Sequence, residues 1–145
     1  MWVQKSKMAM KLATEAVKVR FPSVPNISTE ELCHLMKTDI SKRKLLLLDV
    51  REEKEFHVSH ICNALHVSPS LKDMESVMKI ISETGVSSED VTVVCYCSVG
   101  YRSSSLAQQL LYELHKPSYQ EMKSRILVYN LEGSIFKWAN EGKGP

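Results

Sequence analysis

The sequence predicts an α/β fold with a central, mainly parallel sheet flanked by helices. Three apolar segments, 44–50, 91–97 and 126–131, are too short for helices and too continuous for strands with one face in water. Longer stretches between them carry apolar residues at helical spacing. Strands that alternate with helices indicate βαβ units, whose strands are parallel and whose crossovers are right-handed.

The first half of the predicted domain contains two strands and two helices. Residues 28–31 read Ser-Thr-Glu-Glu, a capping-box pattern that predicts the start of a helix. The run 44–50 is the first buried strand, and the polar segment 51–58 is a turn or a short helix. A short strand over 64–67 follows, and an amphipathic helix over 68–85 completes this half.

The second half repeats the alternation of strand and helix. The strand 91–97 runs directly into a helix over 103–115. A polar loop is predicted over 116–125, followed by the last strand over 126–131 and a final helix over 134–143. We find no internal repeat that would suggest a solenoid.

Length and composition fit a single globular domain. The chain has 145 residues, of which 43% are hydrophobic and 25% charged. Its formal net charge of +2 is too small to indicate nucleic acid or an anionic membrane surface as a partner. No apolar run approaches the ~20 residues that span a bilayer. We therefore expect neither a nucleic-acid nor a membrane partner.

The four cysteines, Cys33, Cys62, Cys95 and Cys97, do not form a disulfide or zinc pattern. Their presence as free thiols fits a reducing compartment. We interpret Cys95 as a core residue rather than a resolving thiol, because a disulfide at i, i+2 along a strand has unfavourable geometry. The histidines show no metal-ligand spacing, and we predict no metal site.

Residues 1–23 form a basic amphipathic extension that precedes the predicted domain, 24–145. It carries five cations and a single acid, Glu15, and its apolar residues Met8, Leu12 and Val19 recur at helical spacing. Two interpretations remain open. One is a mitochondrial presequence, and the other is the N-terminal helix of a cytoplasmic protein, packed or frayed. We expect a cytoplasmic protein, with the mitochondrion as the alternative.

The segment that follows the strand 91–97 carries the chemistry. In open α/β sheets, ligands bind beyond the carboxyl ends of the strands, where Cys97 lies. Unpaired backbone N–H groups at the start of a helix bind anions, and Gly100 permits a backbone angle that turns them inward. The helix dipole and Arg102 favour a thiolate at this place.

Two reaction classes fit a thiolate in an anion-binding loop. A cysteine phosphatase uses C-x5-R, whereas Cys97 and Arg102 are separated by only four residues. Sulfur transfer, in which the thiolate takes up a sulfane sulfur as a persulfide, needs only a small loop with N–H donors. The spacing therefore favours sulfur transfer over a phosphatase or an arsenate reductase.

Three segments resemble the rhodanese family. "CSVGYRS" is similar to the active-site loop of single-domain rhodaneses. "LLLLDVREEKEFHVSHICNALHV" resembles the upstream hallmark, and "VYNLEGSIFKWANEGKGP" the closing segment of the domain. The resemblance covers residues 24–145, and all three segments stand in the family's order.

The resemblance implies a small α/β domain with a parallel sheet of about five strands. It implies a persulfide on Cys97 and no metal or organic cofactor. Asp49 and Arg51 match residues that shape the neighbourhood of the loop in this family, and His60 matches a histidine that we interpret as structural. By position, the loop residues that bind substrate are Ser98, Val99, Gly100, Tyr101, Arg102 and Ser103.

The implied substrates are a small anionic sulfur donor, thiosulfate or a thiol persulfide, and a thiol or cyanide acceptor, with a protein acceptor as a further option.

The sequence also departs from the family. The segment from Tyr112 to Arg125 is longer than usual, and we expect it to contribute to the rim of the site. Arg102 is the loop's single basic residue, whereas family members that use thiosulfate often have more. Thiosulfate is therefore in question as the natural sulfur donor. The alternative function is a non-catalytic rhodanese-like module that binds a partner protein.

Overall fold

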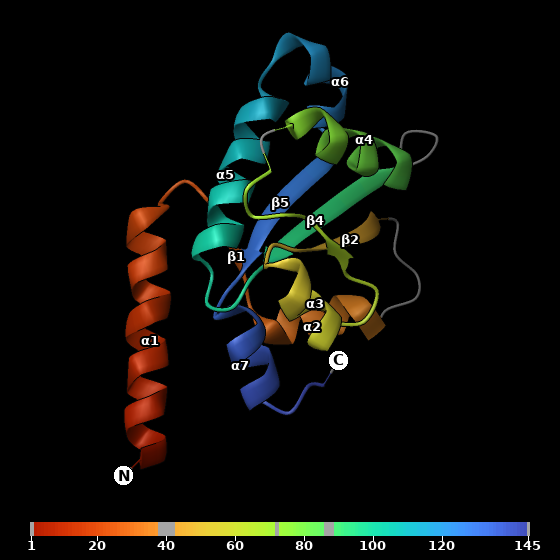
Figure 1. Ribbon diagram of the computed structural model, residues 1–145. Coiled ribbons are helices and arrows are strands. Elements are labelled where there is room, and N and C mark those ends of the chain that lie inside the picture. Colours follow the sequence, from red (N-terminus) through yellow and green to blue (C-terminus); the bar gives the residue numbers. More distant parts are fainter. Residues whose placement is uncertain (1, 38–42, 72, 86–88, 145) are drawn as a thin grey trace.

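The computed structural model describes residues 2–37, 43–71, 73–85 and 89–144 (Figure 1). Five parallel strands form one sheet in the order β1-β5-β4-β2-β3. The strands are β1 (Asn26–Ile27), β2 (Arg43–Asp49), β3 (Leu65–His66), β4 (Asp90–Tyr96) and β5 (Ile126–Leu131). The helices are α1 (Trp2–Arg20), α2 (Thr29–Lys37), α3 (Glu53–Val58), α4 (Met74–Thr84), α5 (Tyr101–Leu114), α6 (Gln120–Lys123) and α7 (Ser134–Asn140). The predicted α/β class is confirmed.

Two buried clusters cover the two faces of the sheet, because successive side chains of a strand point to opposite faces. On one face, Leu46 and Leu48 of β2 belong to the cluster that includes α4 and α5. On the other face, Leu47 packs in the cluster that includes Leu32 of α2 and Trp138 of α7. The uninterrupted apolar run of β2 thus reflects a strand covered on both sides.

The register of the sheet assembles the carboxyl ends of three strands. Asp49 of β2 pairs with Tyr96 of β4, and Cys95 of β4 pairs with Asn130 of β5. From β2 the sheet continues to β3 in one direction and to β4 in the other. The strand order therefore reverses between β2 and β4, which is where ligands of open α/β sheets bind.

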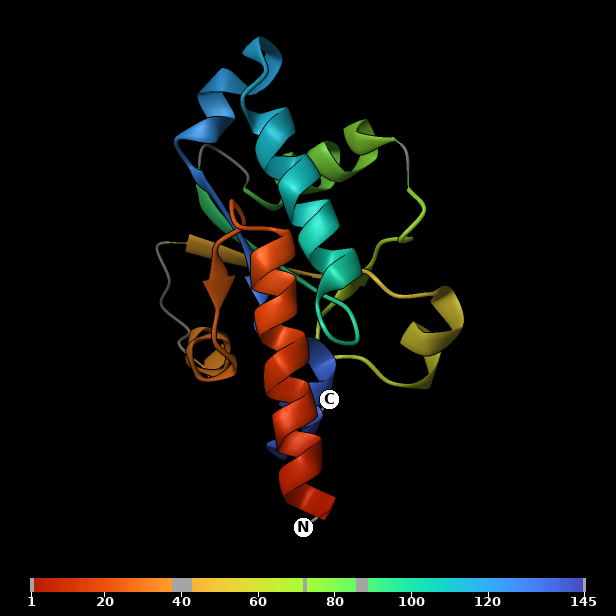
Figure 2. The ribbon, with the colours of Figure 1, turned by 90° about the vertical axis from the view of Figure 1, so that its left-hand side faces the viewer.

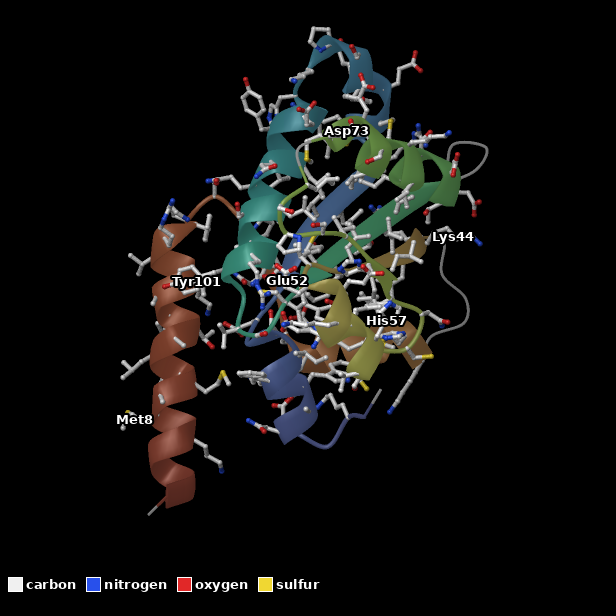
Figure 3. The ribbon with its side chains drawn as sticks, viewed as in Figure 1. Met8, Lys44, Glu52, His57, Asp73 and Tyr101 are labelled. Atoms are coloured by element: carbon white, nitrogen blue, oxygen red, sulfur yellow. The ribbon has the colours of Figure 1, made fainter. Side chains whose placement is uncertain are left out.

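The N-terminal helix α1 lies beside the start of α5 (Figures 1 and 2). Val17 and Phe21 are buried in the core cluster, whereas Met8, Leu12 and Val19 are exposed. The sequence predicted the helix, but its buried side is not the one that carries the recurring apolar residues. Figure 3 shows Met8 on the side of α1 that faces away from the sheet.

The expectation that the segment from Tyr112 to Arg125 contributes to the rim of the site is wrong. Much of it forms a 3-10 turn (Pro117–Tyr119) and α6, at the end of the molecule opposite α3 and α7 (Figures 1 and 2). The 14 residues of α5 carry the chain roughly 20 Å away from its start. The predicted polar loop therefore folds as a helical connection at the amino ends of the strands, where Val91 N–H donates to the Arg125 carbonyl at 2.9 Å.

The strand β1 was not predicted from the sequence. It consists of two residues that pair with Asn130 and Leu131 of β5 and extend the sheet at one edge. The capping box that follows it is confirmed: Glu31 N–H donates to Ser28 Oγ at 3.0 Å, and Ser28 N–H donates to the Glu31 carboxylate at 3.2 Å. Two-residue strands give too little periodicity to be recognised in a sequence.

Candidate active site

Cys97 lies directly after β4, and its side chain is 1% exposed. Three residues separate it from α5, and the last of them, Gly100, has φ of 128°. An L side chain rarely adopts this angle, and a Cβ at Gly100 would also lie 3.4 Å from Val17 and from Asn130. Glycine therefore allows the turn to be tight and to contact the neighbouring elements closely.

Two polar groups approach the sulfur of Cys97. The backbone N–H of Gly100 donates to Sγ at 3.1 Å, and the hydroxyl of Ser103 lies 3.4 Å from it. That hydroxyl also lies 2.6 Å from Oδ1 of Asn130, whose amide donates to Asn26 at 2.9 Å. The sulfur thus faces the start of α5, where unpaired N–H groups favour negative charge.

Helix α7 holds the backbone of the loop from the other side. Its N–H groups at Ile135 and Phe136 donate to the carbonyls of Cys97 and Ser98, at 3.1 and 3.2 Å. Cys97 N–H in turn donates to Ser134 Oγ at 3.2 Å. The left-handed turn at Gly133, with φ of 77°, directs the start of α7 toward the loop. This contact explains why the closing segment of the sequence matters to the site.

Arg102 extends from the first turn of α5 to an acid on α3. Its Nη1 donates to Oε1 of Glu55 at 3.1 Å, and its Nη2 donates to Ser98 Oγ at 2.9 Å. Ser98 Oγ lies 3.4 Å from the second carboxylate oxygen of Glu55, so that each of the three side chains contacts the other two. The hydrogen bond from Arg102 lowers the pKa of the Glu55 carboxyl below its ordinary value, against the effect of burial.

The guanidinium of Arg102 keeps its charge. Burial opposes that charge, but Glu55 and the sulfur of Cys97 raise the pKa of the group above its ordinary value. The side chain is about one-third exposed, as is that of Glu55. The cation is therefore close to the sulfur and open to solvent at the same time.

Asp49 and Arg51 form a buried ion pair beside the loop. Arg51 donates to the two carboxylate oxygens of Asp49 at 2.9 and 2.7 Å, and to the Ser59 carbonyl at 2.6 Å. The hydrogen bond to Asp49 raises the pKa of Arg51. Since α3 lies between Arg51 and Ser59, the pair fixes both ends of the segment that carries Glu55. This position agrees with the predicted role of shaping the neighbourhood of the loop, which stays a prediction.

The remaining predicted loop residues occupy different positions. Val99 is half-buried, and Tyr101 is 44% exposed with its ring edge-on to Phe21, the residue that follows α1, at a centroid distance of 6.4 Å. Figure 3 shows Tyr101 at the start of α5, on the side that faces α1. Tyr101 thus links the loop to α1.

His60, which lies outside the loop, stacks on Phe56 and hydrogen-bonds to its carbonyl, which fits the structural interpretation.

Three contributors to the site were missed by sequence reasoning. Glu55 lies in the segment 51–58, which the sequence predicts as a polar turn or short helix and which belongs to the upstream resemblance. Ser134 begins the predicted final helix, and neither residue was assigned to the site. Asn130 is a polar residue in an otherwise apolar strand, which is a signal that a close reading detects. By contrast, no pattern in the sequence indicates that Val17 contacts the loop.

Cys95 lies in the core cluster and is fully buried. Burial, with a smaller effect of Cys97, raises the pKa of its thiol well above the ordinary value. A thiol held neutral in this way is a poor nucleophile, and the interpretation of Cys95 as a core residue is supported.

Within the described ranges, no three His, Cys, Asp or Glu side chains come together to hold a metal ion.

Comparison with known proteins identifies the family. The family model described as "Rhodanese-like domain" matches residues 32–141. The chain belongs to the rhodanese-like family. Among curated proteins, it is 29% identical over 110 residues to the thiosulfate sulfurtransferase GlpE of Coxiella burnetii, an alignment that covers 75% of this chain and 86% of the relative. The predicted membership of the family is confirmed, and it is a family that includes sulfurtransferases.

Solved structures agree on the fold of this rhodanese-like chain. The As-Sb reductase of Leishmania major superposes with a TM-score of 0.67 at 20% identity, over 83% of this chain and 81% of the other. A Saccharomyces cerevisiae protein, described as a homologue of single-domain rhodanese and of the Cdc25 phosphatase catalytic domain, also gives 0.67, at 21% identity over 83% and 82%. Because one fold carries several activities, these likenesses establish the architecture alone.

The described helices include none with the length and hydropathy needed to cross a bilayer.

Proposed function

We propose that this rhodanese-like chain is a sulfurtransferase that carries a sulfane sulfur as a persulfide on Cys97. The observation that supports this most is the position of Sγ, which receives the Gly100 N–H at 3.1 Å at the start of a 14-residue helix. A sulfur bound to Sγ would extend into the same group of donors. Such preorganised N–H groups stabilise charge that develops during the reaction.

The proposed reaction has two displacement steps. The Cys97 thiolate attacks the outer sulfur of thiosulfate, a new S–S bond forms, and sulfite leaves with the electron pair of the broken bond. An acceptor, cyanide or a thiolate, then attacks the outer sulfur of the persulfide, and Cys97 leaves as the thiolate. Both steps are exchanges at sulfur, in which rates depend on the thiolate form of the nucleophile.

The loop residues have separate parts in this proposal. Gly100 and its neighbours Ser98, Val99 and Tyr101 supply the backbone around the transferred sulfur. Ser103 supplies a hydroxyl to Sγ, and Arg102 attracts an anionic donor. The small donor and the thiol or cyanide acceptor are the proposed partners, and a protein thiol is one form the acceptor takes.

The mass of the protein after incubation with a donor tests this proposal. We expect thiosulfate or a thiol persulfide to add one sulfur atom to Cys97, and cyanide to remove it. Cys97→Ser should take up no sulfur and should lose turnover to the uncatalysed rate. Cys62→Ser is the matched control, since Cys62 is an exposed free cysteine far along the chain from the loop.

Two outcomes would contradict the proposal. If Cys97 takes up no sulfur from any donor, the chain is better explained as a non-catalytic module that binds a partner protein. If a phosphate ester is hydrolysed in a Cys97-dependent manner, the chain is a phosphatase despite its short loop. Because the loop has four residues between Cys97 and Arg102 rather than five, we expect no hydrolysis.

A further inference from the structure

The cation of the active-site loop is already engaged by an acid. Arg102 donates to Glu55 at 3.1 Å and to Ser98 at 2.9 Å, and Ser98 in turn contacts Glu55. Both oxygens of the Glu55 carboxylate therefore face the loop that follows Cys97. An incoming anion meets a cation and a fixed negative charge together, rather than a cation alone.

Several contacts fix the position of this acid. Glu52 N–H donates to Glu55 Oε1 at 3.2 Å, as part of a capping box that begins α3. The segment around α3 is tied down by Arg51, which bonds to Asp49 before the helix and to the Ser59 carbonyl after it. Glu55 is thus held by the backbone of its own helix while it contacts Arg102, and it is not free to move far from the loop.

The charge of the donor decides how strongly this acid matters. Thiosulfate is a dianion, and its sulfonate must approach Arg102, where the Glu55 carboxylate repels it or has to be displaced. The persulfide of a neutral thiol carries no second charge and needs no such displacement. Like-charge juxtaposition is a common means by which proteins reject wrong ligands.

We propose that Glu55 is a specificity-determining residue that disfavours dianionic sulfur donors and directs the site toward persulfides of thiols without further negative charge. This inference rests on the proposed function. In the favoured reaction the Cys97 thiolate attacks the terminal sulfur of R–S–S–H. The bond between the two donor sulfurs breaks, the thiolate R–S⁻ leaves with the electron pair, and Cys97–S–S–H remains.

The test compares two donors on three variants. For Glu55→Gln, the ratio of kcat/KM for thiosulfate to kcat/KM for 2-mercaptoethanol persulfide should rise by about tenfold, through KM for thiosulfate. Glu55→Asp, which keeps the charge, should stay closer to the wild-type ratio. Glu53→Gln is the control, because Glu53 is an exposed acid of the same helix that pairs with His57. An unchanged or lower ratio in Glu55→Gln overturns the proposal.

A binding measurement separates this inference from the proposed function. Thiosulfate affinity is measured by calorimetry on Cys97→Ser and on the double variant Cys97→Ser/Glu55→Gln. We expect the double variant to bind about tenfold more tightly, and less so at high salt, since screening weakens exposed charge interactions. Equal affinity would overturn the role of Glu55. Absence of turnover with both donors, together with tighter binding, would instead overturn the sulfurtransferase and keep the role of Glu55.

Discussion

Cys97 is a buried residue with the surroundings of a functional one. Ordinary core cysteines pack among apolar side chains, as Cys95 does two residues earlier. Cys97 instead faces the Gly100 N–H and the Ser103 hydroxyl, with Arg102 nearby. The two cysteines therefore differ because β4 ends between them, so that only Cys97 lies in the turn that leads to α5.

Gly100→Ala tests the backbone of this turn. The positive φ of 128° should make the variant less stable by about 1–3 kcal/mol, and sulfur transfer should fall because the N–H that faces Cys97 is displaced. Gly142→Ala is the control, since Gly142 also has a positive φ, of 71°, but has nothing within 4 Å of the added Cβ. Urea denaturation and turnover of both variants check this. Normal turnover of Gly100→Ala would contradict it.

At the scale of elements, α1 and α7 hold the loop between them. Helix α7 bonds to the carbonyls of Cys97 and Ser98. Helix α1 brings Val17 against Gly100, and Phe21, directly after α1, lies against Tyr101. An ion pair between Lys18 and Glu132 further ties α1 to the turn that precedes α7. The predicted division into an extension, 1–23, and a domain, 24–145, stays a prediction, but its extension supplies two core residues.

Val17→Ala tests whether α1 is a working part of the domain. Because the Val17 side chain is buried, its truncation should lower the free energy of unfolding by on the order of 2 kcal/mol. Val19→Ala, the same change at an exposed position two residues later, should stay within about 0.5 kcal/mol of the wild type. The midpoints of urea denaturation measure both. Equal midpoints would show that α1 contributes no packing to the stability of the domain.

At the scale of the whole molecule, the parallel sheet brings together segments that are distant in the sequence. The carboxyl ends of β2, β4 and β5 deliver Asp49, Cys97 and Asn130 to one edge. The helices of the two faces then cover the sheet and leave that edge to the loops, as in other open α/β folds. The site therefore depends on the integrity of the core on both faces.

Leu48→Ala tests the packing of the core on β2. Leu48 is completely buried in β2, and its truncation should cost about 2–5 kcal/mol. Leu127→Ala on β5 is the control, since Leu127 is 43% exposed and should change stability far less. Thermal denaturation of the two variants gives the comparison. A smaller loss for Leu48→Ala than for Leu127→Ala would contradict the burial of Leu48 in the core.

The sequence alone determined the strands β2 to β5, the main helices, the family and the loop of Cys97, because these depend on local patterns and on short motifs. The tertiary structure decided the rest. Glu55 and Arg102 are 47 residues apart, and Ser103 and Asn130 are 27 apart. Their contacts follow from strand order and register, which no local pattern encodes. The same reason explains why the segment 112–125, which the sequence favoured for the rim, lies at the opposite end of α5.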